Sequence, residues 1–526
     1  MRRIPRLLQL ISAAWIALLL GASLLWPMTY GYDEPQHIDL AYQYSAHPFT
    51  FYGPGGLQPS AASQGFQRDL PGYPPQRPLA DVAVPARGHR PTLNALGGTR
   101  RVTGAQPNQM VQHPPLYYWL GAVVLRLPGV SHLAWDQQVW LLRLLSVLLL
   151  APLPLLCWAT ARRLAEPAAD RVALLAAVVP LTAPGLVRDV SAVTNDTLLI
   201  LSTSVLLYLL ARVLTGDLTR RTAGAVAGAL AVALLSKGFA LVLPLIVLLA
   251  YAAGARQRRD ELRVRLTALG IAAIGAVVGG LWWLRNLVDY GSVQINGFGD
   301  YQTVLFGPPD HHGSLATFIP GFVSQFVQRI WGGIGLPTPP TIGALAGYGW
   351  LVVTAIGLVL ALLVAGGAQA RARAAVFGVA VVVTFVAIAA SEFGTYHKWS
   401  ATIRGAQGRY LYHLVVVLSV LAAVGWARVL RERYLSPLIA IVLALGLLTQ
   451  IAAWVAVVRQ WYEAKTGAHA GIGHAVSAVL RWSPVPAPLT VLLIAVLPTA
   501  AGGWALVEAV RGTRTAARHA APVSSA

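Results

Sequence analysis

Two adjacent carboxylates, Asp33 and Glu34, stand in the segment GYDEPQH at residues 31–37, directly after the first long apolar run. A carboxylate at this place is anchored by a rigid helix and is still open to the membrane surface, which suits a general base. The alternative is a solvated helix terminus. His37 and His113 are candidates to orient a substrate or to hold a metal ion. Their spacing matches no specific metal signature, so hydrogen bonds within a loop are the favoured role for both histidines.

A further acidic position is Asp196, in the segment SAVTNDTLL at residues 191–199. Asn195 and Asp196 precede an apolar run that begins at Thr197, so both side chains are placed to cap a helix there. A functional role for Asp196 fits the same spacing. The sequence leaves both roles open.

Basic residues occur near the same predicted surface, at Lys237, Arg285, Arg404 and Arg409. Cations at the outer ends of membrane spans run against the usual charge bias and indicate an anionic headgroup. The planar guanidinium group suits phosphate oxygens. Snorkelling toward lipid phosphates in general is the alternative. The substrate pocket is predicted to include His37, His113, Asn195, Asn286 and Tyr410.

The composition indicates which elements position these residues. Of the 526 residues, 56% are hydrophobic and only 11% are charged, so one soluble core cannot bury the apolar surface. Apolar runs long enough to cross a layer roughly 30 Å thick recur along the whole chain. The formal net charge is +20. Its arginines flank apolar runs instead of forming a basic domain, which argues against nucleic acid as a partner. An all-α polytopic membrane protein is therefore predicted.

About twelve transmembrane helices are expected by the length criterion, near residues 7–29, 139–161, 171–189, 197–213, 222–236, 238–254, 266–284, 348–366, 375–391, 411–427, 437–457 and 487–510. Arginine clusters occupy alternate connections, at 1–6, 161–163, 218–221, 256–265, 371–373, 428–433 and 511–518. The positive-inside rule then places both termini in the cytoplasm. The long connections at 30–138, 190–196, 285–347, 391–410 and 458–486 lie outside the cell membrane, together with the candidate site.

The first outer loop, residues 30–138, contains a turn-rich and mobile stretch and then the segment HPPLYYWLGAVVLRLPG at 113–129. Pro114 and Pro115 favour a helix start, and the aromatic residues that follow suit the interface between lipid and water. A helix lying on the membrane is predicted there. Residues 1–430 are interpreted as the catalytic module, and residues 431–526 as further transmembrane helices with a cytoplasmic tail.

Seven segments resemble those of the GT-C glycosyltransferases and follow the same order. They are DEPQH, HPPLYYWLGAVVLRL, RLLSVLLL, TNDTLL, LSKGFALVLPL, WWLRNLVDYG and QGRYLYH, within residues 30–413. The pattern is similar to the branch of bacterial protein O-mannosyltransferases and aminoarabinose transferases. The aminoarabinose branch more often has a lysine beside the double proline. This chain has QHPP, which argues against transfer of aminoarabinose to lipid A.

The resemblance implies a GT-C-like fold and a polyprenyl-phosphate sugar as donor, with transfer on the outer side of the cytoplasmic membrane and usually with inversion. It maps the base onto Asp33, places Glu34 where it can orient the acceptor, and matches Asp196 with an acid of many relatives. The charge that grows on the departing phosphate is then expected to be stabilised by Lys237, Arg285, Arg404 and Arg409. No metal is required for this chemistry, although some relatives use a divalent cation.

The expected acceptor is a glycan, lipid or protein of the cell envelope. Two alternatives remain open at this point. One is a non-catalytic carrier or flippase for polyprenyl-linked sugars. The other is a polymerase or ligase of envelope polysaccharide, which uses related donors and a longer acceptor. Acids within the spans are scarce, which argues against an ion-coupled transporter.

Overall fold

The structure is a computed structural model that describes residues 4–68, 77–165, 169–253, 259–310, 312–331, 333, 344–364, 366–399, 403 and 406–520. Up to the middle of the chain its helices are α1 (Arg6–Leu25), α2 (Glu34–Ala46), α3 (Ala61–Arg68), α4 (Leu116–Leu125), α5 (Trp135–Leu150), α6 (Leu153–Leu164), α7 (Ala169–Val178), α8 (Pro184–Val190), α9 (Asp196–Leu214), α10 (Arg220–Leu234), α11 (Leu243–Ala253) and α12 (Arg259–Tyr290). The later helices are α13 (Gln302–Phe306), α14 (Leu315–Ile330), α15 (Ala344–Leu363), α16 (Ala368–Trp399), α17 (Val415–Val429), α18 (Leu435–Val457), α19 (Ile472–Trp482), α20 (Ala487–Val491) and α21 (Leu497–Ala520). The extended pairing in the described part is limited to two isolated bridges. The all-α prediction is confirmed.

Eight helices in the described part are long and apolar enough to cross a membrane, and the bent pair Asp170–Thr182 and Pro184–Val190, which contains α7 and α8, makes a ninth if it is counted as one broken span. The two halves of this span meet at 73°. The bend follows from Pro184, since a residue before proline is driven out of helical geometry, and Ala183 has φ −112° and ψ 89°. The remaining predicted spans coincide with α10, α11 and the apolar part of α15, Gly347–Leu363. The count of twelve therefore stays a prediction.

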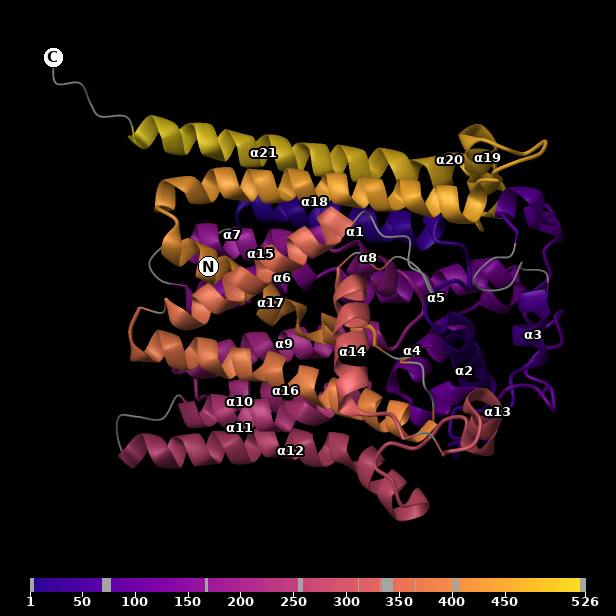
Figure 1. The fold of residues 1–526 in the computed structure, drawn as a ribbon, viewed down its shortest axis with the longest axis horizontal. Helices are drawn as coiled ribbons and strands as arrows, with labels where there is room; N and C mark the ends of the chain where they lie inside the picture. Colours follow the sequence, from indigo (N-terminus) through magenta and orange to yellow (C-terminus); the bar gives the residue numbers. More distant parts are fainter. Residues whose placement is uncertain are drawn as a thin grey trace.

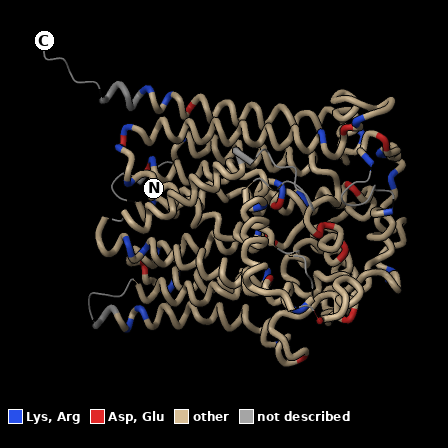
Figure 2. The backbone as a smooth tube through the Cα atoms, viewed as in Figure 1, with Lys and Arg blue, Asp and Glu red and all other residues tan. Residues whose placement is uncertain are grey.

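The long helices lie side by side as a bundle, with α2, α3 and α4 gathered at the end away from both termini (Figure 1). Lys and Arg are frequent at the end that holds the termini (Figure 2). Lys and Arg also occur at the opposite end of the bundle, together with Asp and Glu (Figure 2). The orientation in the cell membrane remains a prediction.

The first outer loop forms a packed cap in its described part. Helices α2 and α4 pack against each other, and α4 begins directly after Pro115, as predicted. Asp39 is 1% exposed. Its Oδ1 accepts a hydrogen bond from the backbone N–H of Ser60 at 3.0 Å, and its Oδ2 accepts one from Asn108 Nδ2 at 2.8 Å. Of the stretch predicted to be mobile, residues 69–76 lie outside the described residues.

The C-terminal helices hold this cap from the side. Arg90 forms a buried ion pair with Asp136 at the start of α5 and donates to the carbonyl oxygens of Arg481 and Ser483. Trp482 donates its indole N–H to the carbonyl of Leu79 at 3.0 Å. Helix α21 also packs against α1 and α18. The division at residue 430 stays a prediction, because the two parts share these contacts.

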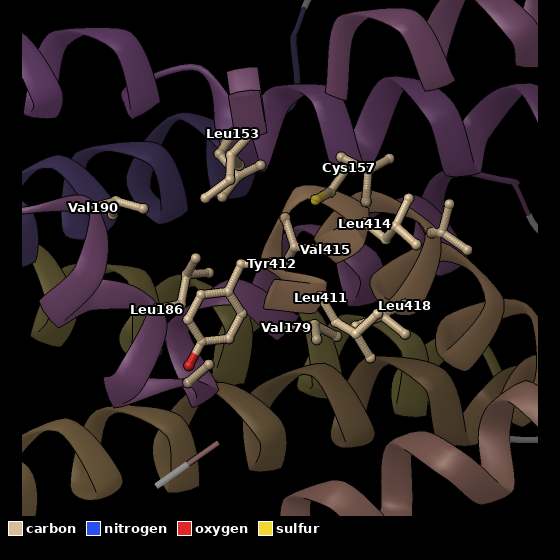
Figure 3. Close-up of a cluster of buried hydrophobic side chains, with 14 of the residues drawn as sticks. Leu153, Cys157, Val179, Leu186, Val190, Leu411, Tyr412, Leu414, Val415 and Leu418 are labelled. Atoms are coloured by element: carbon tan, nitrogen blue, oxygen red, sulfur yellow. The ribbon is translucent and has the colours of Figure 1, made fainter. Parts of the chain in front are cut away.

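A buried apolar cluster joins α6 to α8 and the 3-10 helix η8 (Gly408–Leu414), the elements that carry Asp189 and Arg409. Figure 3 shows Leu186 and Val190 of α8, Leu153 and Cys157 of α6, and Leu411, Tyr412 and Leu414 of η8 packed together. The hydroxyl of Tyr412 donates to the carbonyl of Ile330 at 2.9 Å. This packing sets the position of α8 relative to η8.

Gly185 is expected to tolerate no side chain in this cluster. A Cβ added there would lie 2.3 Å from Tyr412 Oη and 3.2 Å from the carbonyl oxygen of Gly333. We expect Gly185→Ala to lower the free energy of unfolding by about 1–3 kcal/mol, as overpacked cores do. The measurement is the thermal unfolding midpoint in detergent. The double variant Gly185→Ala/Tyr412→Phe should recover part of the loss, because it removes the closest atom. An unchanged midpoint for the single variant would contradict the expectation.

Candidate active site

Asp33 lies in a strained turn between α1 and α2. Its φ is +53°, a left-handed conformation that residues other than glycine rarely adopt. It occupies the N-cap position of α2, but its side chain forms no capping hydrogen bond. The side chain is 45% exposed, and Gln109 Nε2 donates to its Oδ1 at 3.4 Å. The carboxylate is therefore held in place and remains open to a substrate. Strained backbone of this kind often occurs at functional sites.

Glu34, the neighbouring carboxylate, is fully buried and serves a different purpose. It forms a two-pronged ion pair with Arg143 of α5, with both N–O distances at 2.7 Å and both side chains at 0% exposure. Its oxygens also accept the backbone N–H groups of Gly31 and Val193, each at 2.9 Å. These partners occupy both carboxylate oxygens of Glu34. We therefore assign Glu34 the role of holding the turn that contains Asp33, whereas the resemblance placed it where it could orient the acceptor.

Arg143 completes this clamp from the other side. Its remaining N–H groups donate to the carbonyl oxygens of Ser23, Trp26 and Pro27, at 2.7–2.8 Å. These carbonyls end α1, where helical acceptors lack partners. The Glu34–Arg143 pair therefore ties the end of α1, the Asp33 turn and the segment at Val193 into one unit.

The bend between α7 and α8 brings two more carboxylates to this unit. Asp189 is at the end of α8 and Asp196 is at the start of α9, with side chains 2% and 8% exposed. Neither Asn195 nor Asp196 acts as the predicted helix cap. Asn195, at the N-cap position, forms no capping bond and instead donates to the carbonyl of Ser236 at 3.0 Å. The polar contacts of Asp196 favour the functional role that the sequence left open.

Arg409 joins the three carboxylates. Its Nη1 lies 3.2 Å from Asp189 Oδ1 and 3.5 Å from Asp196 Oδ2, and its Nη2 lies 3.5 Å from Asp33 Oδ2. Lys237 Nζ lies 2.8 Å from the other oxygen of Asp196. We call these five residues the Asp33 cluster. Four of them are almost completely buried, and Asp33 forms the open edge.

Aromatic rings surround the cations of the Asp33 cluster. The Arg409 guanidinium carbon lies 4.1 Å from the centroid of the Tyr32 ring, which also receives Arg188 at 3.9 Å. Lys237 Nζ is 5.6 Å from the ring of Phe239 and 5.9 Å from that of Tyr410. Contacts of this kind stabilise a cation that has lost its water. Tyr410 therefore lies beside the cluster, and its place in a substrate pocket stays a prediction.

His37 and His113 face the same cluster from the cap. Burial, followed by the charge of Lys237, lowers the pKa of His37 well below its usual value and lowers the pKa of His113 to about 3. The His37 ring is 3.0 Å from the hydroxyl of Tyr118 and stacks on its ring. Nδ1 of His113 is buried and has no hydrogen-bond partner in the described part. Both histidines are therefore neutral near pH 7, and His113 presents a free polar atom.

The depressed pKa of His113 predicts lower stability in acid. Below about pH 6.5, His113 binds a proton in the unfolded chain, whereas in the folded protein it stays neutral down to about pH 3. The free energy of unfolding that this histidine contributes is therefore fully present above pH 6.5 and is lost as the pH falls toward 3. We expect the free energy of unfolding to drop by about 2 kcal/mol per such histidine between pH 7 and pH 5. Unfolding midpoints at both pH values should show a smaller drop in His113→Gln. His132→Gln, at an exposed position, should match the wild type. Equal drops in all three proteins would refute the expectation.

Three residues that the sequence predicted for the site are not found at the Asp33 cluster, because two lie in α12 and one is not among the residues that the structure describes. Arg285 pairs with Asp289 at 3.2 Å near the end of α12 and does not contact the Asp33 cluster. Asn286, 0% exposed, donates to the carbonyl of Val293. Arg404 lies outside the described residues. Within the described part, no group of three or more His, Cys, Asp and Glu residues is arranged to hold a metal ion.

Sequence reasoning missed Asp189 and Gln109. A signal for Asp189 was present, because Arg188 and Asp189 form a charged pair inside the predicted span 171–189, and ionisable residues within spans usually have a function. No comparable signal marked Gln109, which is one of many polar residues in a long loop. Its contact with Asp33 depends on the folding of the cap.

Comparison with known proteins supports the motif analysis. Residues 112–283 match the family model of dolichyl-phosphate-mannose-protein mannosyltransferases. This match confirms the predicted resemblance to GT-C membrane glycosyltransferases. The matched region contains helices α4 to α11 and most of α12, and it includes Asp189, Asp196 and Lys237 of the Asp33 cluster. No curated protein sequence matches the chain significantly.

Several solved structures are similar to this one at low sequence identity. ArnT from Cupriavidus metallidurans bound to undecaprenyl phosphate is 17% identical, with a TM-score of 0.48, over 97% of this chain and 75% of that one. The Archaeoglobus fulgidus oligosaccharyltransferase in the apo form is 13% identical, with a TM-score of 0.45, over 87% of this chain and 56% of that one. The oligosaccharyltransferase AglB from the same organism, in complex with an inhibitory peptide and a dolichol-phosphate, is 14% identical, with a TM-score of 0.42. The match covers 88% of this chain and 57% of that one.

Proposed function

We propose that this protein transfers a sugar from a polyprenyl-phosphate donor to a hydroxyl group of a cell-envelope acceptor, on the extracytoplasmic face of the cytoplasmic membrane. The observation that carries the proposal is the place of Asp33. It is a half-exposed carboxylate at the open edge of a cluster whose other members are buried. The family match supports a donor of the polyprenyl-phosphate class, since the matching family is described by a dolichyl-phosphate sugar.

The proposed reaction uses Asp33 as the base. An acceptor hydroxyl is a weak nucleophile, so removal of its proton as the oxygen attacks the anomeric carbon lowers the barrier. The bond between that carbon and the donor phosphate oxygen breaks, and the phosphate leaves with its electron pair. Asp33 retains the proton until it passes to solvent through the exposed side of the cluster. Attack opposite the leaving group inverts the sugar carbon.

Arg409 and Lys237 are the proposed partners of the departing phosphate. Both are buried cations fixed by carboxylates, so they need little reorganisation when charge develops. The contact between Arg409 and Asp33 is long, at 3.5 Å, which favours its exchange for a phosphate oxygen. Asp189 and Asp196 hold the two cations in position. Arg285, by its place at the end of α12, is not part of this proposed donor site.

The test is a transfer assay with the purified protein in proteoliposomes. Radiolabelled polyprenyl-phosphate sugars are supplied together with a cell-envelope extract, and the acceptor fraction is analysed for a new glycosidic bond. We expect label in the acceptor and release of polyprenyl phosphate in equal amounts. Movement of intact donor between leaflets without a new bond would instead identify a carrier or flippase. A ladder of long products on a gel would identify a polymerase or ligase.

A further inference from the structure

The first outer loop presents an exposed aromatic side chain beside the end of α12. Residues 47–50 form a tight turn, closed by a hydrogen bond from Thr50 N–H to the carbonyl of His47 at 3.3 Å, with Pro48 and Phe49 at the tip. Trp119 Nε1 donates to the carbonyl of Pro48 at 2.8 Å. Proline at the second position of such a turn limits its motion. Phe49 is 85% exposed, so a fixed turn holds its ring away from the rest of the protein.

Aromatic rings link this turn to α12. The ring centroid of Phe51 lies 6.2 Å from Trp119 and 5.8 Å from Trp282 of α12. The Arg285 guanidinium carbon is 5.3 Å from the Phe51 ring, 5.1 Å from Trp282 and 5.7 Å from Tyr290. The turn therefore lies against the last turns of α12, and Arg285 stands between the rings.

The surface around this turn continues the membrane-facing side of α12. Leu281, Leu284 and Val288 are 57%, 55% and 75% exposed, which suits contact with lipid tails. Polar residues begin directly afterwards, with Asp289 and Ser292. Arg285, Trp282 and Tyr290 thus lie where the apolar surface ends. Aromatic and basic residues are enriched at this depth, since rings tolerate the headgroup region and cations meet lipid phosphates.

From this arrangement we infer that the turn at residues 47–50 inserts Phe49 into the lipid layer beside α12, while Arg285 contacts the phosphate group of a phospholipid there. The Arg285 side chain is 28% exposed, so part of the guanidinium is open to a headgroup. Its Nε lies 3.2 Å from Asp289 Oδ2, and its Nη2 donates to the Tyr290 hydroxyl at 3.2 Å. These two contacts fix the orientation of the guanidinium group at the end of α12. The occupant is the bilayer itself and not the sugar donor. The inference is independent of the chemistry at Asp33.

The single cysteine makes a direct test of the Phe49 contact practical. Cys157 is buried and 0% exposed, so the wild-type protein should take up little thiol-reactive spin label. A nitroxide is attached to Phe49→Cys in proteoliposomes of phosphatidylcholine and phosphatidylglycerol, and its collisions with oxygen and with a water-soluble nickel complex are measured. Val288→Cys serves as the lipid-facing reference. Thr103→Cys, exposed elsewhere in the same loop, serves as the aqueous reference.

We expect the label at Phe49→Cys to collide more with oxygen than with the nickel complex, as at Val288→Cys. A label that behaves as at Thr103→Cys would overturn the insertion. For Arg285, native mass spectrometry of the detergent-purified protein titrated with phosphatidylglycerol should show about fivefold weaker retention in Arg285→Gln. Arg101→Gln removes an arginine that lies over Tyr52 in the same loop, and it should retain lipid as the wild type does. Equal retention in Arg285→Gln and the wild type would overturn the phosphate contact.

Discussion

Asp33→Asn is expected to lower the rate of sugar transfer by about 10²–10⁴-fold, the range that a positioned general base contributes. Asparagine keeps the shape and the hydrogen bond from Gln109 but cannot take a proton from the acceptor hydroxyl. Binding of the donor should persist, because the proposed phosphate partners are Arg409 and Lys237. The measurement is single-turnover transfer from a labelled donor, combined with donor binding by filtration.

The matched control is Asp81→Asn, which removes an exposed carboxylate from the same outer loop. Its transfer rate should equal that of the wild type. Transfer by Asp33→Asn at the wild-type rate would remove the proposed base, even if the overall reaction were confirmed. Loss of donor binding together with transfer would assign Asp33 to the donor site instead.

Arg143→Met is expected to lower the free energy of unfolding by about 3–5 kcal/mol, the usual result of removing one partner of a buried ion pair. Glu34 would then remain at 0% exposure without its cation, and the carbonyl oxygens of Ser23, Trp26 and Pro27 would lose their donor. Thermal unfolding in detergent measures the effect. Transfer should fall as well, because the Asp33 turn depends on this clamp.

The double variant Glu34→Gln/Arg143→Met separates charge from shape. It removes both charges, so its stability should lie above that of Arg143→Met, since the uncompensated carboxylate is gone. The unpaired carbonyls at the end of α1 should keep it below the wild type. A double variant no more stable than Arg143→Met would show that the carbonyl contacts, and not the ion pair, dominate the clamp.

The different fates of Asp33 and Glu34 show where sequence reasoning reaches its limit. The pair DE after an apolar run marks a candidate site, yet it does not say which carboxylate is free. The structure separates them, because Glu34 reaches Arg143, 109 residues away, whereas Asp33 reaches Arg409 across 376 residues. Arg285 and Arg409 likewise looked equivalent as cations near the outer ends of spans. Of these two arginines, Arg409 contacts Asp33, Asp189 and Asp196, whereas Arg285 pairs with Asp289.

The sequence by itself determined the helical and membrane-spanning character, the helix after Pro115 and the resemblance to GT-C glycosyltransferases that the family match over residues 112–283 supports. These features depend on local composition, on proline stereochemistry and on the order of short segments, which can be read without knowing long-range contacts. The tertiary structure alone decided that Glu34 is clamped, that Asp189 joins the site through the bend at Ala183, and that Arg285 pairs with Asp289 away from the Asp33 cluster. Those outcomes depend on which distant helices pack together, and a buried charge is stable only where that packing supplies its partner.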